Sequence, residues 1–78
     1  MSPLLTAKHK VIVDYKIDEP NLYRKWLHKK SGGVYWIDYV AYNESDLSPT
    51  IIYRSTKGDG LIWCRPASEF FDGRFELI

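Results

Sequence analysis

Residues that can hold an anion between aromatic rings come close together in the second half of the chain. Tyr53 and Arg54 are adjacent, and Trp63 and Arg65 follow after a short segment that contains two glycines. Arginine binds phosphate or carboxylate oxygens through its forked guanidinium group, and an aromatic face can stack on a nucleobase. The set therefore predicts an anion-binding surface. A cation–π stack that merely covers a sheet is the alternative interpretation.

Strand geometry decides which of these four side chains can meet. Successive residues of a strand point to opposite faces, so Trp63 and Arg65 share a face whereas Tyr53 and Arg54 do not. Whether Tyr53 or Arg54 joins the face of Trp63 depends on the strand register, which the sequence leaves open.

A second group of basic residues precedes a glycine pair at positions 32 and 33. Its members are Arg24, Lys25, His28, Lys29 and Lys30, and no acidic residue lies among them. Such a run is typical of a solvated helix face, but it can also form an anion site. We expect His28, Lys29 and Lys30 to add a second basic wall to the binding surface.

No set of residues predicts catalysis. Nucleophilic catalysis needs a nucleophile, a base and an orienting group. Cys64 could pair with His9 or His28, but its place between two strand residues favours a small buried hydrophobe. Of the carboxylates that could act as a pair (Asp38, Asp59, Glu69 and Asp72), Asp59 and Asp72 each precede a glycine in a turn, where backbone geometry favours Asp. Neither histidine has an acidic residue at metal-ligand spacing. We expect no enzyme, no metal and no cofactor.

Composition narrows the class of protein further. The chain has 78 residues, which predicts a single domain, and one cysteine, which excludes an internal disulfide. No apolar run approaches the roughly 20 residues needed to span a bilayer, and residues 1–6 lack a signal-peptide pattern. We therefore expect a cytoplasmic protein that does not contact a membrane. The pI of about 7.8 argues against binding to long nucleic acid, which usually calls for a pI above about 9.

The first half of the chain predicts a strand and then a helix. Alternation over residues 10–16 is typical of a strand. Residues 18–20, with two acidic residues and a proline, indicate a helix start. An apolar stripe at helical spacing follows, made of Leu22, Tyr23, Trp26 and Leu27. The glycine pair at 32 and 33 would then end this helix.

The second half predicts an antiparallel sheet. Residues 34–42 read as a long strand with aromatic residues on both faces, Tyr35, Ile37 and Tyr39 sharing one of them. Residues 51–55 and 61–65, joined by a glycine-containing turn, predict a hairpin. A single helical turn over 67–71 and a closing strand over 75–78 complete the chain. The fold class is α+β: a small curved antiparallel sheet or an SH3-like barrel, with one N-terminal helix.

An ordered set of short motifs resembles a small bacterial and phage family, domain of unknown function sixteen fifty-three. The matching residues are His28, Lys30, Gly32, Gly33, Tyr35, Tyr53, Arg54, Gly60, Trp63, Arg65, Pro66 and Phe70. Ser31 makes the loop before the glycine pair one residue longer than in the family pattern. The resemblance implies a compact β-rich core over residues 28–78, with residues 1–27 as an N-terminal extension, and it implies no activity.

These observations lead to one expected function and its alternatives. We expect a non-enzymatic, homo-oligomeric binding protein, phage-encoded or related to phage proteins, that sequesters an anionic nucleotide-derived signal of bacterial defence. The candidate ligand-binding residues are His28, Lys29, Lys30, Tyr35, Tyr53, Arg54, Trp63 and Arg65. The alternatives are a protein-interaction module that inhibits a host enzyme and a weak nucleic-acid binder.

Overall fold

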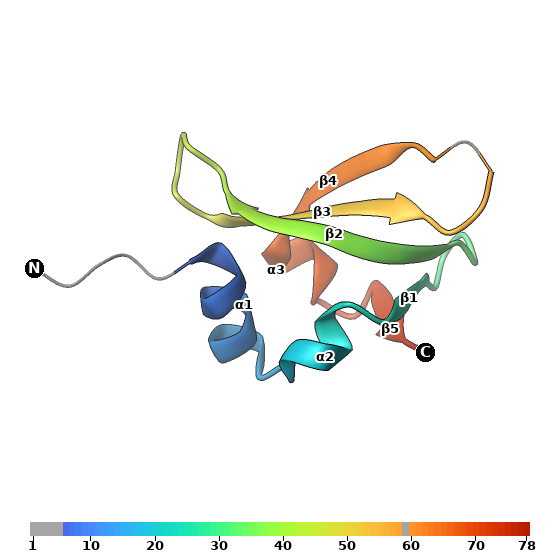
Figure 1. The fold of residues 1–78 in the computed structure, drawn as a ribbon, viewed down its shortest axis with the longest axis horizontal. Coiled ribbons are helices and arrows are strands. Elements are labelled where there is room, and N and C mark those ends of the chain that lie inside the picture. Colours follow the sequence, from blue (N-terminus) through green and yellow to red (C-terminus); the bar gives the residue numbers. More distant parts are fainter. Residues whose placement is uncertain (1–5, 59) are drawn as a thin grey trace, which may run out of the picture.

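The computed structural model describes residues 6–58 and 60–78, so Asp59 and the start of the chain lie outside the described residues. Within this part, three helices and five strands follow one another along the chain (Figure 1). Their bounds are α1 Ala7–Tyr15, α2 Glu19–Leu22, β1 Lys25–His28, β2 Val34–Tyr42, β3 Pro49–Ser55, β4 Ile62–Pro66, α3 Ala67–Phe70 and β5 Phe75–Leu77. None of these helices has the length and apolar character needed to cross a membrane.

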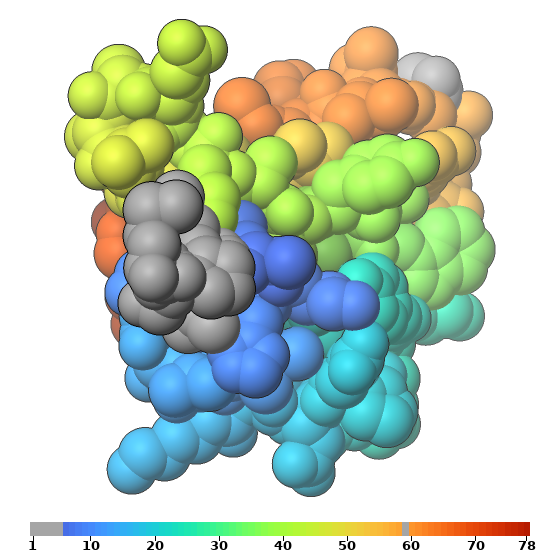
Figure 2. All heavy atoms as spheres, turned by 60° about the vertical axis from the view of Figure 1, so that its left-hand side comes forward, coloured from blue at the N-terminus to red at the C-terminus, as the bar shows by residue number. Residues whose placement is uncertain are grey.

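The five strands form one antiparallel sheet in the order β4-β3-β2-β1-β5. The helices lie on one side of β2, β3 and β4, and α1 and α3 contact these strands (Figure 1). Figure 2 shows α1, in blue, beneath the green and yellow residues of β2 and the loop that follows it. The predicted α+β fold with a curved antiparallel sheet is confirmed. The sheet is open, because β4 and β5 lie at its two edges and do not pair, so the barrel form is not adopted.

The strand expected over residues 10–16 is wrong, because this segment belongs to helix α1. Thr6 caps the helix by accepting the His9 backbone N–H at 3.1 Å, and Lys16 ends it in the left-handed conformation at φ 54°. Val11 is fully buried whereas Val13 is 56% exposed. Two residues that alternation places on one face therefore lie on different faces, as the 3.6-residue period of a helix requires.

The long helix expected from residue 18 to the glycine pair is also wrong. Only α2 is helical, and Lys25–His28 form strand β1, which pairs with β2 on one side and β5 on the other. Leu22 and Trp26 do not share a helix face. Instead, the Trp26 indole N–H donates a hydrogen bond to the Leu22 carbonyl at 3.2 Å. This bond satisfies a carbonyl at the end of α2. The glycine pair forms the β1–β2 turn, with Gly32 at φ +75°.

A bulge changes the faces of strand β2. Tyr35 and Ile37 face the core, but the register with β3 shifts between Ile37 and Tyr39, which leaves Asp38 as the extra residue. Beyond the bulge Val40 packs against the core, and Tyr39 is 69% exposed on the opposite face. The expectation that Tyr39 shares a face with Tyr35 is therefore wrong, because one inserted residue reverses every later side chain.

One core joins the helices to the sheet. Its buried members are Val11, Leu22, Trp26, Ile37, Ile51, Tyr53, Ala67, Phe70 and Phe75. They come from every described element except β4. Phe70 and Phe75 stack with ring centroids 4.0 Å apart and planes at 9°. The core of this small domain is therefore centred on aromatic contacts between α3 and β5.

Ile51→Val is expected to lower the free energy of unfolding by about 0.5–1.5 kcal/mol, because Ile51 is fully buried and the change removes one methylene. Ile62→Val is the matched control, since Ile62 is 60% exposed and the same change there should shift stability by less than about 0.5 kcal/mol. Urea unfolding followed by tryptophan fluorescence measures both values. Equal losses in the two variants would contradict the placement of the core.

Candidate functional site

A pocket opens on the inner face of the sheet, between the β1–β2 turn and strand β4. Its volume is about 240 Å³, and its walls are largely aromatic. The lining residues are His28, Ser31, Tyr35, Tyr53, Trp63, Arg65 and Phe75. They come from β1 to β5 and the β1–β2 turn, so the sheet order itself assembles the pocket.

The register of the β3–β4 hairpin selects which arginine enters the pocket. Tyr53 lies opposite Trp63, and Arg65 lies opposite the buried Ile51. Tyr53, Trp63 and Arg65 therefore share the inner face. Arg54 lies opposite Ile62 and points to the outer face, so the question that the sequence leaves open is answered in favour of Tyr53.

Arg65 is the cation of the pocket. Its guanidinium carbon lies 5.5 Å from the centre of the Phe75 ring, in cation–π geometry. Within residues 6–58 and 60–78, no carboxylate forms an ion pair with Arg65. The guanidinium thus keeps hydrogen-bonding capacity for an anion that enters the pocket.

Arg54 and Arg74 differ from Arg65, because each forms ion pairs with acidic side chains of the same chain. The Arg54 Nε donates to Asp38 Oδ2 at 2.7 Å on the outer face. Arg74 pairs with Glu69 at 3.1 Å and with Asp72 at 3.2 Å. These two arginines therefore carry internal ion pairs.

The β1–β2 turn supplies the polar wall of the pocket. His28 Nδ1 and Ser31 Oγ share a hydrogen bond at 2.7 Å, and the Gly33 backbone N–H donates to the same hydroxyl at 3.2 Å. The His28 ring also lies 4.8 Å from the Phe75 ring. These contacts fix the imidazole at the edge of the pocket. Ser31 and Phe75 are the two lining residues that no sequence motif marks as site residues, although the pattern of residues 75–78 predicts a strand that holds Phe75.

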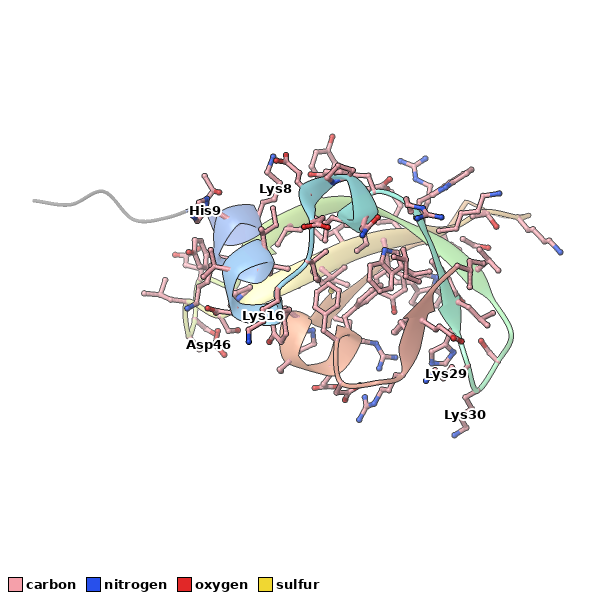
Figure 3. All side chains as sticks on the ribbon, turned by 90° about the horizontal axis from the view of Figure 1, so that it is seen from below. Lys8, His9, Lys16, Lys29, Lys30 and Asp46 are labelled. Carbon is pink, nitrogen blue, oxygen red and sulfur yellow. The ribbon has the colours of Figure 1, made fainter. Side chains whose placement is uncertain are left out.

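Five of the eight expected site residues come together, and three do not. His28, Tyr35, Tyr53, Trp63 and Arg65 line the pocket. Lys29 and Lys30 are exposed in the β1–β2 turn, where Figure 3 shows Lys30 extending away from the body of the molecule. Arg54 lies on the outer face. Of the second basic wall expected from His28, Lys29 and Lys30, only His28 therefore lines the pocket.

The expected catalytic and metal-binding candidates are also dispersed. Cys64 is exposed on the outer face, opposite Ile52, so the expectation of a buried side chain is wrong. His9 lies on α1, at the opposite end of the molecule from Lys29 (Figure 3). No group of three or more potential metal ligands occurs among the described residues.

Hydrogen bonds shift the pKa of Lys8, Lys10 and Asp46, which lie outside the pocket lining. A hydrogen bond from Lys8 to Glu19 raises the pKa of that lysine, and a hydrogen bond to Asp14 raises the pKa of Lys10. Hydrogen bonds from Ser48 lower the pKa of Asp46. Figure 3 shows Lys8 and Asp46 near α1, far from Lys29 and Lys30.

Comparison with protein families identifies the part of the chain that holds the pocket. The family model described as protein of unknown function (DUF1653) matches residues 23–75. The chain belongs to this family. The DUF1653 match includes all seven residues that line the pocket, whereas α1 and α2 lie before it. No curated protein and no solved structure matches the chain.

Gly33 leaves room for the side chain of Tyr35, which lines the pocket of this DUF1653 protein. A Cβ atom at this position would lie 2.9 Å from Cε2 of the Tyr35 ring and 2.9 Å from the Tyr35 hydroxyl oxygen, so the side chain would have to move. We expect Gly33→Ala to lower the free energy of unfolding by about 1–3 kcal/mol through overpacking. In a Tyr35→Ala background the cost of Gly33→Ala should be much smaller, because the clashing ring is gone. Urea unfolding of the four proteins measures the coupling, and equal costs in both backgrounds would exclude this contact as the cause.

Proposed function

We propose that this DUF1653 protein is a non-enzymatic binding domain that sequesters a small anionic, nucleotide-derived molecule. The proposal includes the expectation that the protein is phage-encoded or phage-related and that the ligand is a signal of bacterial defence. Arg65 carries the proposal. It is a guanidinium in an aromatic pocket, and within the described residues its charge has no carboxylate partner.

The chemistry of the walls favours a ligand with a flat ring and an anionic group. Trp63 is 49% exposed at the pocket and offers an aromatic face for stacking. Arg65 shares the face of Trp63, so it can donate two hydrogen bonds to a phosphate held beside the stacked ring. The His28–Ser31 pair on the facing wall adds further polar contacts.

The volume limits the size of the bound group. About 240 Å³ lies below the range of roughly 300–1,000 Å³ for pockets that hold drug-sized ligands. A single ring with a single anionic group matches this space better than a whole dinucleotide. A larger signalling nucleotide would therefore be held by one of its nucleotide units.

Ser31 and His28 are the two pocket residues that could act as a nucleophile and its base if the protein converted its ligand. Their 2.7 Å contact resembles that of a nucleophile and its base. However, Ser31 Oγ also accepts the Gly33 N–H, which gives this hydroxyl a structural role in the turn. No described carboxylate forms an ion pair with His28, so a third, orienting group is not evident. We therefore propose retention of the ligand rather than its conversion.

A protein-interaction module that inhibits a host enzyme is the second candidate. The outer face of the sheet favours it, because Trp36, Tyr39 and Ile62 are 40%, 69% and 60% exposed there. Lys25 Nζ lies 5.9 Å from the centre of the Trp36 ring, which adds a cation to this surface. A stoichiometric host protein recovered with the chain, without a bound small molecule, would favour this candidate.

Titration calorimetry tests the leading proposal. We expect binding of nucleoside monophosphates, and weaker binding of the matching nucleosides that lack phosphate. Arg65→Ala should weaken binding by roughly tenfold to a hundredfold, because hydrogen bonds to charged groups contribute about 1.5–3 kcal/mol. Arg54→Ala is the matched control and should leave affinity unchanged, since Arg54 faces the outer side.

Two results would contradict the proposal. The first is an absence of binding heat across linear and cyclic nucleotides. The second is chemical conversion of the ligand, detected by mass spectrometry after incubation with excess protein, because sequestration returns the ligand unchanged. Binding that Arg54→Ala and Arg65→Ala weaken equally, and that falls steeply with salt, would indicate the weak nucleic-acid binder instead.

A further inference from the structure

Strand β4 is an open edge of the sheet. It pairs with β3 on one side, and no strand of the described residues pairs with it on the other. Figures 1 and 2 show β4, in orange, along the upper border of the molecule, with no described segment above it. The side chains of Ile62, Trp63 and Cys64 are exposed, and β4 contributes no residue to the buried core. The strand therefore presents both unpaired backbone groups and apolar side chains.

The two edges of the sheet differ in how they are protected. Edge strands of monomeric proteins are typically short, bulged or charged, which prevents pairing with another chain. β5 has three residues and carries Glu76 at its centre. β4 has five residues and pairs with β3 without a bulge, and its one charged residue, Arg65, faces the inner side of the sheet with Tyr53 and Trp63. Pro66 interrupts pairing only at its end.

We propose that two copies of this chain pair through β4 in antiparallel orientation, centred on Cys64. A strand that pairs with itself about a two-fold axis forms the same contacts twice, which is the commonest symmetry of homo-oligomers. With Cys64 on the axis, Trp63 of each copy lies opposite Arg65 of the other. A cation then faces an exposed aromatic ring on both sides of the axis, so the edge is complementary to itself.

The pairing places the two pockets next to each other. Trp63 and Arg65 line the pocket and also lie at the proposed junction. The second copy would therefore contribute its Trp63 beside the Arg65 of the first pocket and narrow the open side. The dimer forms through the strand edge, so this inference stands whether or not the pocket binds a nucleotide.

Sedimentation velocity over a range of concentrations tests the pairing. We expect a concentration-dependent dimer of the full chain. Cys64→Lys should abolish the dimer over the range in which the parent chain dimerises, because the two ammonium groups would lie directly opposite each other on the axis. Cys64→Ser keeps the size of the side chain without the charge and should remain dimeric.

A control on the outer face separates edge pairing from packing of one sheet on another. Tyr39→Lys adds a charge at a position that is 69% exposed on the outer face of β2, away from the edge. It should leave the dimer intact. Loss of the dimer in Tyr39→Lys with retention in Cys64→Lys would overturn the proposal in favour of face packing.

The single cysteine provides a second measurement that needs no substitution. Because Cys64 would lie opposite its own copy, mild oxidation of the folded protein should give a covalent dimer faster than oxidation of the urea-unfolded chain. A monomeric mass at every concentration, or equal crosslinking rates for folded and unfolded chains, would overturn the proposal.

Discussion

The stack of Phe70 on Phe75 is the contact on which the rest of the structure depends. Its centroids are 4.0 Å apart, and it joins helix α3 to the last strand of the sheet. Phe75 also contacts Tyr53 and His28 and lies beneath the Arg65 guanidinium. The same ring therefore belongs to the core and forms the floor of the pocket. In a domain of 78 residues there is too little interior to separate the two roles.

The pocket therefore contains two kinds of residue, those buried in the core and those accessible to solvent. Tyr53 and Phe75 are 6% and 7% exposed, so their truncation would remove core contacts together with the pocket floor. Trp63 lies on β4, which contributes nothing to the buried core, and it is 49% exposed. Arg65 lies on the same strand and face. Trp63 and Arg65 therefore line the pocket from a strand that has no member in the buried core.

Single-residue shifts of register decide what each face of the sheet displays. The bulge at Asp38 turns Tyr39 to the outer face, and it leaves a carboxylate that pairs with Arg54. Arg54 is thereby held in an ion pair with Asp38, whereas Arg65, eleven residues later, faces the aromatic pocket. Residue type alone cannot distinguish these two arginines, because both lie within two residues of an aromatic residue in the sequence. The distinction comes from strand pairing, in which a shift by one residue exchanges the faces.

The sequence by itself determined the elements that turn residues and short alternating patterns mark. The β3–β4 hairpin, the turn of α3 and the closing strand are all predicted correctly, because turn residues and alternation act within a few positions. Strand β1 could not be predicted this way. Its apolar spacing fits a helix, and pairing with β2 on one side and with β5, about fifty residues later, on the other makes Lys25–His28 a strand. The sequence likewise named five of the seven pocket residues, but only the tertiary structure brought them together and excluded Arg54, Lys29 and Lys30. The physical reason is that side-chain identity sets what a residue can bind, whereas long-range strand pairing sets which residues face one another.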